Sequence, residues 1–183
     1  MLTELQRKKL PLMFALNDRN GDGVVTKQDY EQTAQILARI GGVSAGTPEY
    51  EHIRSTIMSF WNDVHAKADK DGDDRITLQE WIKYWNELLA VEEEYDRVYR
   101  SFSVIVARTL DKNGDGRIAP EEFTESLIQC GVDDNAASDC FRHFDVNGDG
   151  YISQDEYVAG VREYFYSSDP DSPGNWLFGP LKL

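Results

Sequence analysis

Apolar residues recur every three or four positions along most of the chain, the spacing that gathers side chains on one face of an α-helix. The clearest example is Ile53, Ile57, Phe60, Trp61 and Val64. Polar segments rich in glycine and aspartate separate such stretches, so the pattern predicts an all-α chain. Helices are expected near residues 3–16, 27–40, 48–64, 81–89, 95–110, 120–130, 134–144 and 157–165.

The polar segment between the last two expected helices, residues 145–156, resembles a twelve-residue calcium-binding loop of the EF-hand type. Gly150 at loop position 6 has no Cβ, and this permits the sharp turn that such a loop needs. The expected ligands at positions 1, 3, 5, 7 and 12 are Asp145, Asn147, Asp149, the backbone carbonyl of Tyr151, and Glu156. Spacing this constrained favours a metal site over an ordinary acidic surface turn.

The same loop recurs at residues 18–29, 69–80 and 111–122, so the chain is built from four helix–loop–helix units. The predicted ligands there are Asp18, Asn20, Asp22, the carbonyl of Val24, and Asp29; Asp69, Asp71, Asp73, the carbonyl of Arg75, and Glu80; and Asp111, Asn113, Asp115, the carbonyl of Arg117, and Glu122. Oxygen donors of this kind suit a hard cation, so the sequence predicts up to four Ca²⁺ ions.

Three loop positions depart from the usual pattern. Asp74 replaces glycine at position 6 of the second loop, which makes that site the least secure of the four. Ala119 at position 9 of the third loop has no side-chain oxygen, so water is expected there. Asp29 ends the first loop with a side chain one methylene shorter than glutamate, and this brings that site nearer the six-coordinate geometry that Mg²⁺ requires.

Position 8 of every loop holds a β-branched apolar residue, as suits a short antiparallel pairing between adjacent loops. These residues are Val25, Ile76, Ile118 and Ile152. Pairing the first loop with the second and the third with the fourth predicts two EF-hand domains, residues 1–92 and 93–183. The second domain includes a tail, residues 167–183, whose apolar segment 176–178 is expected to pack on a compact body.

Composition narrows the function. The net charge of −14 argues against nucleic acid and anionic membranes as partners and fits a protein that collects cations. The first ten residues lack the apolar run of a signal peptide, and no apolar stretch approaches the roughly 20 residues of a membrane helix. Cys130 and Cys140 are interpreted as free thiols of a reducing compartment, so a cytoplasmic location is expected.

The chain resembles the invertebrate sarcoplasmic calcium-binding proteins, calexcitin included. Besides the four loops, the resemblance rests on the Trp-Ile-Lys-Tyr-Trp segment at 81–85 and on the ending Gly-Asn-Trp-Leu-Phe-Gly-Pro-Leu at 174–181. It implies four EF-hands packed as two pairs in a compact cytosolic monomer that buffers Ca²⁺ and also Mg²⁺. Members of that family often lose one or two sites, whereas this sequence keeps the oxygen ligands of all four.

Related functions stay open at this point. A luciferin carrier, which binds coelenterazine and releases it with Ca²⁺, is one alternative with a small apolar ligand, and a Ca²⁺ sensor of calexcitin type is another. Calcium-triggered photoproteins are oxygenases that need inward histidines on the first and last helices. The first helix here has none, and Val161 occupies the place on the last. We therefore expect no enzymatic activity.

Overall fold

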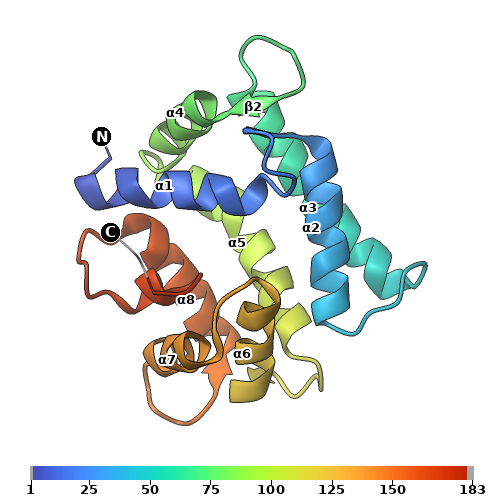
Figure 1. Ribbon diagram of the computed structural model, residues 1–183, viewed down its shortest axis with the longest axis vertical. Coiled ribbons are helices and arrows are strands. Elements are labelled where there is room, and N and C mark those ends of the chain that lie inside the picture. The colour runs from blue at the N-terminus through green and yellow to red at the C-terminus, as the bar shows by residue number, and fades with distance from the viewer. Residues whose placement is uncertain (1, 181–183) are drawn as a thin grey trace. The chain divides into compact units, whose positions relative to one another are not determined.

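The computed structural model describes residues 2–180, and its regular secondary structure is almost entirely helical (Figure 1). The helices are α1 (Glu4–Asn17), α2 (Lys27–Ile40), α3 (Pro48–Ala68), α4 (Leu78–Leu88), α5 (Glu92–Leu110), α6 (Pro120–Gln129), α7 (Asp134–Phe144), α8 (Gln154–Tyr166) and the 3₁₀ turn η1 (Pro173–Trp176). The strands are β1 (Val24–Val25), β2 (Ile76–Thr77), β3 (Arg117–Ile118) and β4 (Ile152–Ser153). The all-α prediction is confirmed, and every expected loop lies between two helices.

The helix ends follow local sequence chemistry. Thr3 begins α1 with a capping box, in which its side chain accepts the N–H of Gln6 and the Gln6 side chain accepts the N–H of Thr3. Thr47 is the N-cap of α3, and Pro48 is the first residue of that helix. Asp133 caps α7 by accepting the N–H of Ala136 at 3.0 Å.

The four strands form two antiparallel pairs, β1 with β2 and β3 with β4. Val25 lies opposite Ile76, and Ile118 lies opposite Ile152. These are the position-8 residues of the four loops, and each side chain is almost fully buried. The predicted pairing of first loop with second and third with fourth is therefore confirmed.

The chain forms two compact units. One comprises the described residues up to Arg39 together with Val43–Phe102, and the other comprises Ile40–Gly42 together with the chain from Ser103 onward. Each unit holds one strand pair with its flanking loops. The expectation that the two halves are separate domains meeting near residue 92 stays a prediction.

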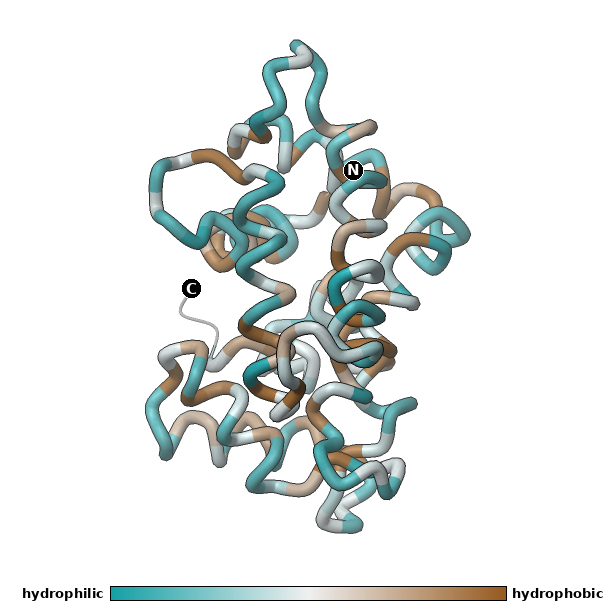
Figure 2. The backbone as a smooth tube through the Cα atoms, turned by 90° about the vertical axis from the view of Figure 1, so that its right-hand side faces the viewer, coloured by the Kyte–Doolittle hydropathy of each residue, from teal (hydrophilic) through white to brown (hydrophobic). Residues whose placement is uncertain are grey.

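An aromatic cluster forms the core of the first unit. The ring of Phe14 on α1 meets Trp81 on α4 edge-on at 6.0 Å, and α1 and α4 lie side by side. Tyr99 on α5 contacts both Phe60 on α3 and Trp85 on α4, with ring centroids 5.0 and 5.2 Å apart. The aromatic stripes therefore belong to the core, as sequence spacing indicates. In Figure 2, hydrophobic and hydrophilic segments alternate along the helices, and the long loops are mainly hydrophilic.

The tail of the second unit packs on α7 and α8. Leu177 is buried, and the ring of Trp176 stacks on His143 of α7 with centroids 4.0 Å apart. The Asn175 amide donates to the backbone carbonyls of Asp169 and Pro170, which fixes the turn before η1. Docking of the apolar segment is confirmed for Trp176 and Leu177. Phe178 touches Tyr164 but stays 41% exposed, and tail residues 181–183 lie outside the described residues.

No helix between residues 2 and 180 combines the length and the hydropathy needed to cross a membrane.

Candidate metal centres

We name the four loops I (residues 18–29), II (69–80), III (111–122) and IV (145–156). In loop I the backbone wraps around the carboxylate of Asp18 at position 1. One oxygen accepts the N–H groups of Gly21 and Asp22 at 2.9 and 3.1 Å, and the other accepts that of Gly23 at 2.9 Å. The Asn20 side chain accepts the N–H of Asp22 at 2.8 Å and donates to the Asp22 carboxylate at 3.0 Å. These bonds bring the oxygens of positions 1, 3 and 5 together.

Loops III and IV repeat this arrangement, so three distant segments of the chain share one geometry. In loop III, Asp111 accepts from Gly114, Asp115 and Gly116 at 2.8, 3.1 and 2.9 Å, and Asn113 accepts from Asp115 at 2.8 Å. In loop IV, Asp145 accepts from Asp149 and Gly150 at 3.1 and 3.0 Å, and Asn147 accepts from Asp149 at 2.8 Å. The oxygens predicted to bind the metal from positions 1, 3 and 5 therefore lie together in each of these loops.

Position 7 was expected to contribute a backbone carbonyl, and its backbone also holds the neighbouring ligand. In every loop its N–H donates to the position-5 carboxylate, which orients that side chain. The pairs are Val24 with Asp22, Arg75 with Asp73, Arg117 with Asp115, and Tyr151 with Asp149, at 3.1, 2.9, 2.9 and 3.0 Å. The side chains of Arg117 and Tyr151 face one another across loops III and IV, with the guanidinium 5.2 Å from the ring.

The position-12 carboxylate bridges the two ends of each loop. Asp29 accepts from the N–H groups of Thr26 and Arg19 at 2.8 and 3.0 Å, Glu80 from Thr77 and Lys70 at 3.0 and 3.2 Å, and Glu122 from Ala119 and Lys112 at 2.9 and 2.9 Å. In loop IV, Glu156 accepts from Ser153 at 2.9 Å and, at the longer distance of 3.4 Å, from Asn147 at position 3. Asp29 makes these bonds despite its shorter side chain, and it is almost fully buried.

Position 9 has a role that the sequence reading missed. Thr77 and Ser153 cap the helices that leave loops II and IV, and position 12 is the third residue of those helices. The hydroxyls of Thr26, Thr77 and Ser153 donate to the position-12 carboxylates at 2.6, 2.8 and 2.8 Å. The capping box therefore orients the last ligand of the loop. Its signature, Ser or Thr followed three residues later by Glu, is readable in loops II and IV.

Loop II departs from the other three at its central turn. The backbone of Asp74 has φ of +62°, in the region that glycine occupies in loops I, III and IV. A Cβ makes this conformation costly, although aspartate tolerates it better than most residues. The turn is nevertheless made, because the Asp74 N–H donates to Asp69 at 3.1 Å as its glycine counterparts do.

Charge is most crowded in loop II, where oxygens of Asp69, Asp71 and Asp73 lie within 4.8 Å of one another. Burial raises the pKa of Asp71, and the neighbouring Asp73 carboxylate raises it further. Hydrogen bonds from Thr77 hold the pKa of Glu80 below its usual range. Burial works against the charged form of Asp69, but N–H groups of Gly72 and Asp74 outweigh it and lower that pKa. A bound cation would relieve this crowding of like charges.

The donor sets fit calcium. Each loop offers three or four carboxylates and no thiol or imidazole at positions 1, 3, 5 and 12, and hard, flexible oxygen coordination is what Ca²⁺ prefers. The inward oxygens are already oriented by backbone N–H groups, so little rearrangement is needed. Such loops can take up and release divalent cations.

Comparisons with known proteins agree with this geometry. The family model for an EF-hand domain pair matches residues 96–162. Calerythrin of Saccharopolyspora erythraea is 27% identical over 168 residues, covering 91% of this chain and 95% of its own. The luciferin-binding protein of Renilla reniformis is 28% identical over 177 residues, covering 95% and 93%. A sarcoplasmic calcium-binding protein from amphioxus, with 18% identity, has the same fold, with a TM-score of 0.78 over 97% of this chain and 98% of its own.

Proposed function

We propose that this chain, which belongs to the calcium-binding EF-hand proteins of the sarcoplasmic, calexcitin and luciferin-binding group, acts as a cytosolic buffer of Ca²⁺ and Mg²⁺. A buffer binds ions without exposing a docking surface for a target protein, whereas a sensor exposes one when it binds Ca²⁺. The observation that carries the proposal is the tail, because residues 173–177 pack on α7 and α8 of the second unit. A sensor would keep such an apolar helix face for a target.

The close fit of the tail supports a permanent cover. Gly174 lies so near α8 that a Cβ added to it would meet the Gly160 carbonyl oxygen at 2.5 Å. The Glu163 carboxylate anchors this approach by accepting the Ser172 hydroxyl at 2.8 Å and the Gly174 N–H at 3.1 Å. A target helix would have to break these bonds and displace Leu177 from its buried position.

Each loop binds one ion in this proposal. The carboxylate or amide oxygens at positions 1, 3 and 5, the carbonyl at position 7 and the carboxylate at position 12 surround it, and water completes the shell where position 9 supplies none. Asp29 makes loop I the site of mixed Ca²⁺ and Mg²⁺ preference. Cys130 and Cys140 form no disulfide in the structure, which supports a reducing, cytoplasmic location, and we assign the chain no catalytic chemistry.

A carrier of a small apolar ligand is the second candidate, and a specific observation favours it. Among the described residues, the hydroxyls of Tyr30 and Tyr84 and the indole N–H of Trp81 are buried without a hydrogen-bond partner. A ligand with polar groups could satisfy them. Incubation with coelenterazine tests this candidate, because a shifted absorbance that survives gel filtration would support the carrier.

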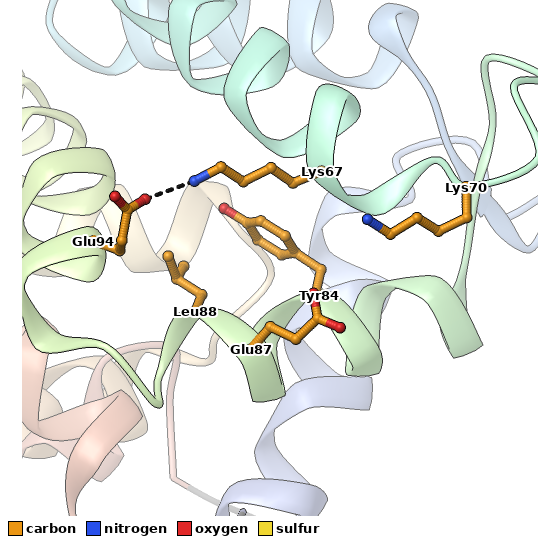
Figure 3. Close-up of a pocket in the computed structure, with 6 residues that line it drawn as sticks. All are labelled: Lys67, Lys70, Tyr84, Glu87, Leu88 and Glu94. Atoms are coloured by element: carbon orange, nitrogen blue, oxygen red, sulfur yellow. Dashed lines mark hydrogen bonds and ion pairs between the residues drawn. The ribbon is translucent and has the colours of Figure 1, made fainter.

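The pocket beside Tyr84 is too small to enclose such a ligand on its own. It has a volume of about 210 Å³, below the range of about 300–1,000 Å³ usual for sites that enclose a drug-sized molecule. Figure 3 shows the Tyr84 hydroxyl pointing toward the ion pair between Lys67 and Glu94, whose charged atoms are 2.7 Å apart. The charged side chains that line this pocket and its small volume suit water better than a large apolar ligand.

Calorimetric titration with Ca²⁺, with and without Mg²⁺, tests the buffer proposal. The wild-type chain should bind four ions, and Glu156→Gln should weaken one of them by roughly tenfold or more. Glu121→Gln is the matched control, because Glu121 is exposed and stands one residue before a proposed ligand. Four unchanged sites in Glu156→Gln, or fewer than four in the wild type, would contradict the ligand assignment.

A further inference from the structure

His65 on α3 brings an imidazole nitrogen to the edge of loop II. Its Nε2 lies 3.2 Å from a carboxylate oxygen of Asp69 and 3.0 Å from one of Asp74. These three donor atoms lie within 4.8 Å of one another. Loops I, III and IV have glycine where loop II has Asp74, so this cluster of one nitrogen and two oxygens belongs to loop II alone.

A hydrogen bond does not account fully for this arrangement. A single ring nitrogen carries at most one N–H, yet Nε2 faces two carboxylate oxygens at nearly equal distances. The Asp69 side chain is 3% exposed, so its charge is poorly solvated. The nitrogen and the two carboxylate oxygens together enclose a small space, as the ligand atoms of a metal site do.

We propose that His65, Asp69 and Asp74 bind a d-block divalent cation such as Zn²⁺, with water as a fourth ligand. Imidazole nitrogen is a preferred ligand of these metals and a poor one for Ca²⁺. Zinc bonds of about 2.0–2.2 Å in a tetrahedron place neighbouring ligand atoms about 3.3–3.6 Å apart. The two distances from Nε2, 3.0 and 3.2 Å, are close to that spacing, and the Asp69 and Asp74 oxygens lie within 4.8 Å of each other.

The surroundings hold the ligands in place. The imidazole rests against the Trp61 ring, with centroids 5.1 Å apart, one helical turn before the loop. The Asp69 oxygen that faces His65 is also the one that accepts the Asp74 N–H, so backbone and side chains converge at the same point. Asp74 is 88% exposed at its side chain, which leaves an open route for the ion.

The site shares Asp69 with the proposed calcium site of loop II. Its other carboxylate oxygen accepts the Gly72 N–H at 2.7 Å inside the loop, on the side where Ca²⁺ would bind. Two divalent cations on opposite oxygens of one carboxylate repel each other. Binding of Zn²⁺ should therefore weaken Ca²⁺ in loop II and leave the other three loops unchanged.

Titration with Zn²⁺ and Co²⁺ in calcium-free buffer at pH 7.5 tests the site, and it does so independently of calcium binding. Co²⁺ should give the visible d–d absorption that is typical of a four-coordinate ion with a nitrogen ligand. His65→Gln should lose that absorption and weaken Zn²⁺ by at least about tenfold. His52→Gln, which removes another exposed imidazole, and Cys130→Ser, which removes the exposed thiol, should change neither. Equal Zn²⁺ binding by His65→Gln and the wild type would overturn the proposal.

Asp74→Gly separates the metal site from folding of the loop. Glycine restores the residue that the other loops use at this turn, so the variant should keep Ca²⁺ binding while it loses Zn²⁺ and the Co²⁺ absorption. Circular dichroism checks that the helices remain. Retention of tight Zn²⁺ binding by this variant would contradict the assignment of Asp74. If saturating Zn²⁺ leaves the Ca²⁺ affinity of loop II unchanged, Asp69 is not shared by the two sites.

Discussion

Ile118 lies directly opposite Ile152 in the strand pair that joins loops III and IV, and the two side chains are 1% and 0% exposed. Each isoleucine stands one residue after the position-7 carbonyl of its own loop. Tightening of one loop around an ion must therefore act on the backbone of its partner. This contact connects the core of the second unit to both of its proposed sites.

Shortening Ile152 should destabilise the second unit. Ile152→Ala removes buried methyl groups and leaves a cavity, so the free energy of unfolding should fall by about 2–4 kcal/mol. Urea unfolding of the Ca²⁺-loaded protein measures the change. Val146→Ala in the same loop is the control, because Val146 is 68% exposed and should contribute within about 0.5 kcal/mol. Equal effects of the two substitutions would show that strand pairing does not stabilise the loops.

Lengthening Asp29 should change ion preference at loop I. Asp29→Glu should let both carboxylate oxygens reach the ion, so Ca²⁺ affinity should rise and Mg²⁺ competition should weaken by roughly tenfold, about 1.4 kcal/mol. Calorimetry with Ca²⁺ in the presence of Mg²⁺ measures this. Glu122→Asp is the reciprocal variant in loop III and should shift preference toward Mg²⁺. An unchanged Mg²⁺ effect in both would mean that position 12 does not set selectivity.

A methyl group at position 174 should loosen the tail. The added Cβ would meet Glu163 and the Tyr164 backbone at 2.6 Å, so Gly174→Ala should destabilise the tail contact by about 1–3 kcal/mol. Trp176 fluorescence should shift toward that of an exposed indole as its stacking on His143 is lost. Ser168→Ala, at an exposed position near the start of the tail, should leave the spectrum unchanged. An unshifted spectrum for Gly174→Ala would argue against the docked tail.

The two cysteines should differ in reactivity. Burial raises the pKa of the Cys140 thiol to about 11, and the residue has no exposed surface, whereas Cys130 is exposed. A raised pKa keeps the thiol protonated, so at pH 8 only about 0.1% of Cys140 is thiolate even before access is considered. Alkylation of the native protein, followed by mass spectrometry, should modify Cys130 and spare Cys140. Rapid modification of both would contradict the packing around α7.

Much of the fold could be predicted because its determinants are local. The loop spacing and the β-branched residue at position 8 each act within a dozen residues, and the structure has them as expected. His65 was missed as a partner of loop II because the expected helix ended near residue 64, whereas α3 continues to Ala68 and places His65 one turn before Asp69. The exposure of Phe178 was missed for a similar reason. Its hydrophobicity favours burial, but the room beside Leu177 depends on how η1 meets α8.

Fluorescence of the hydrophobic dye ANS, read in the metal-free, Mg²⁺-loaded and Ca²⁺-loaded protein, tests the buffer proposal most directly. A tail that stays on α7 and α8 leaves no new apolar surface when the loops fill, and neutralised charge should tighten the fold. We therefore expect the highest fluorescence without metal, and no increase when Ca²⁺ replaces Mg²⁺. A strong rise with Ca²⁺ over the Mg²⁺ form would contradict the buffer and identify a sensor that opens on binding.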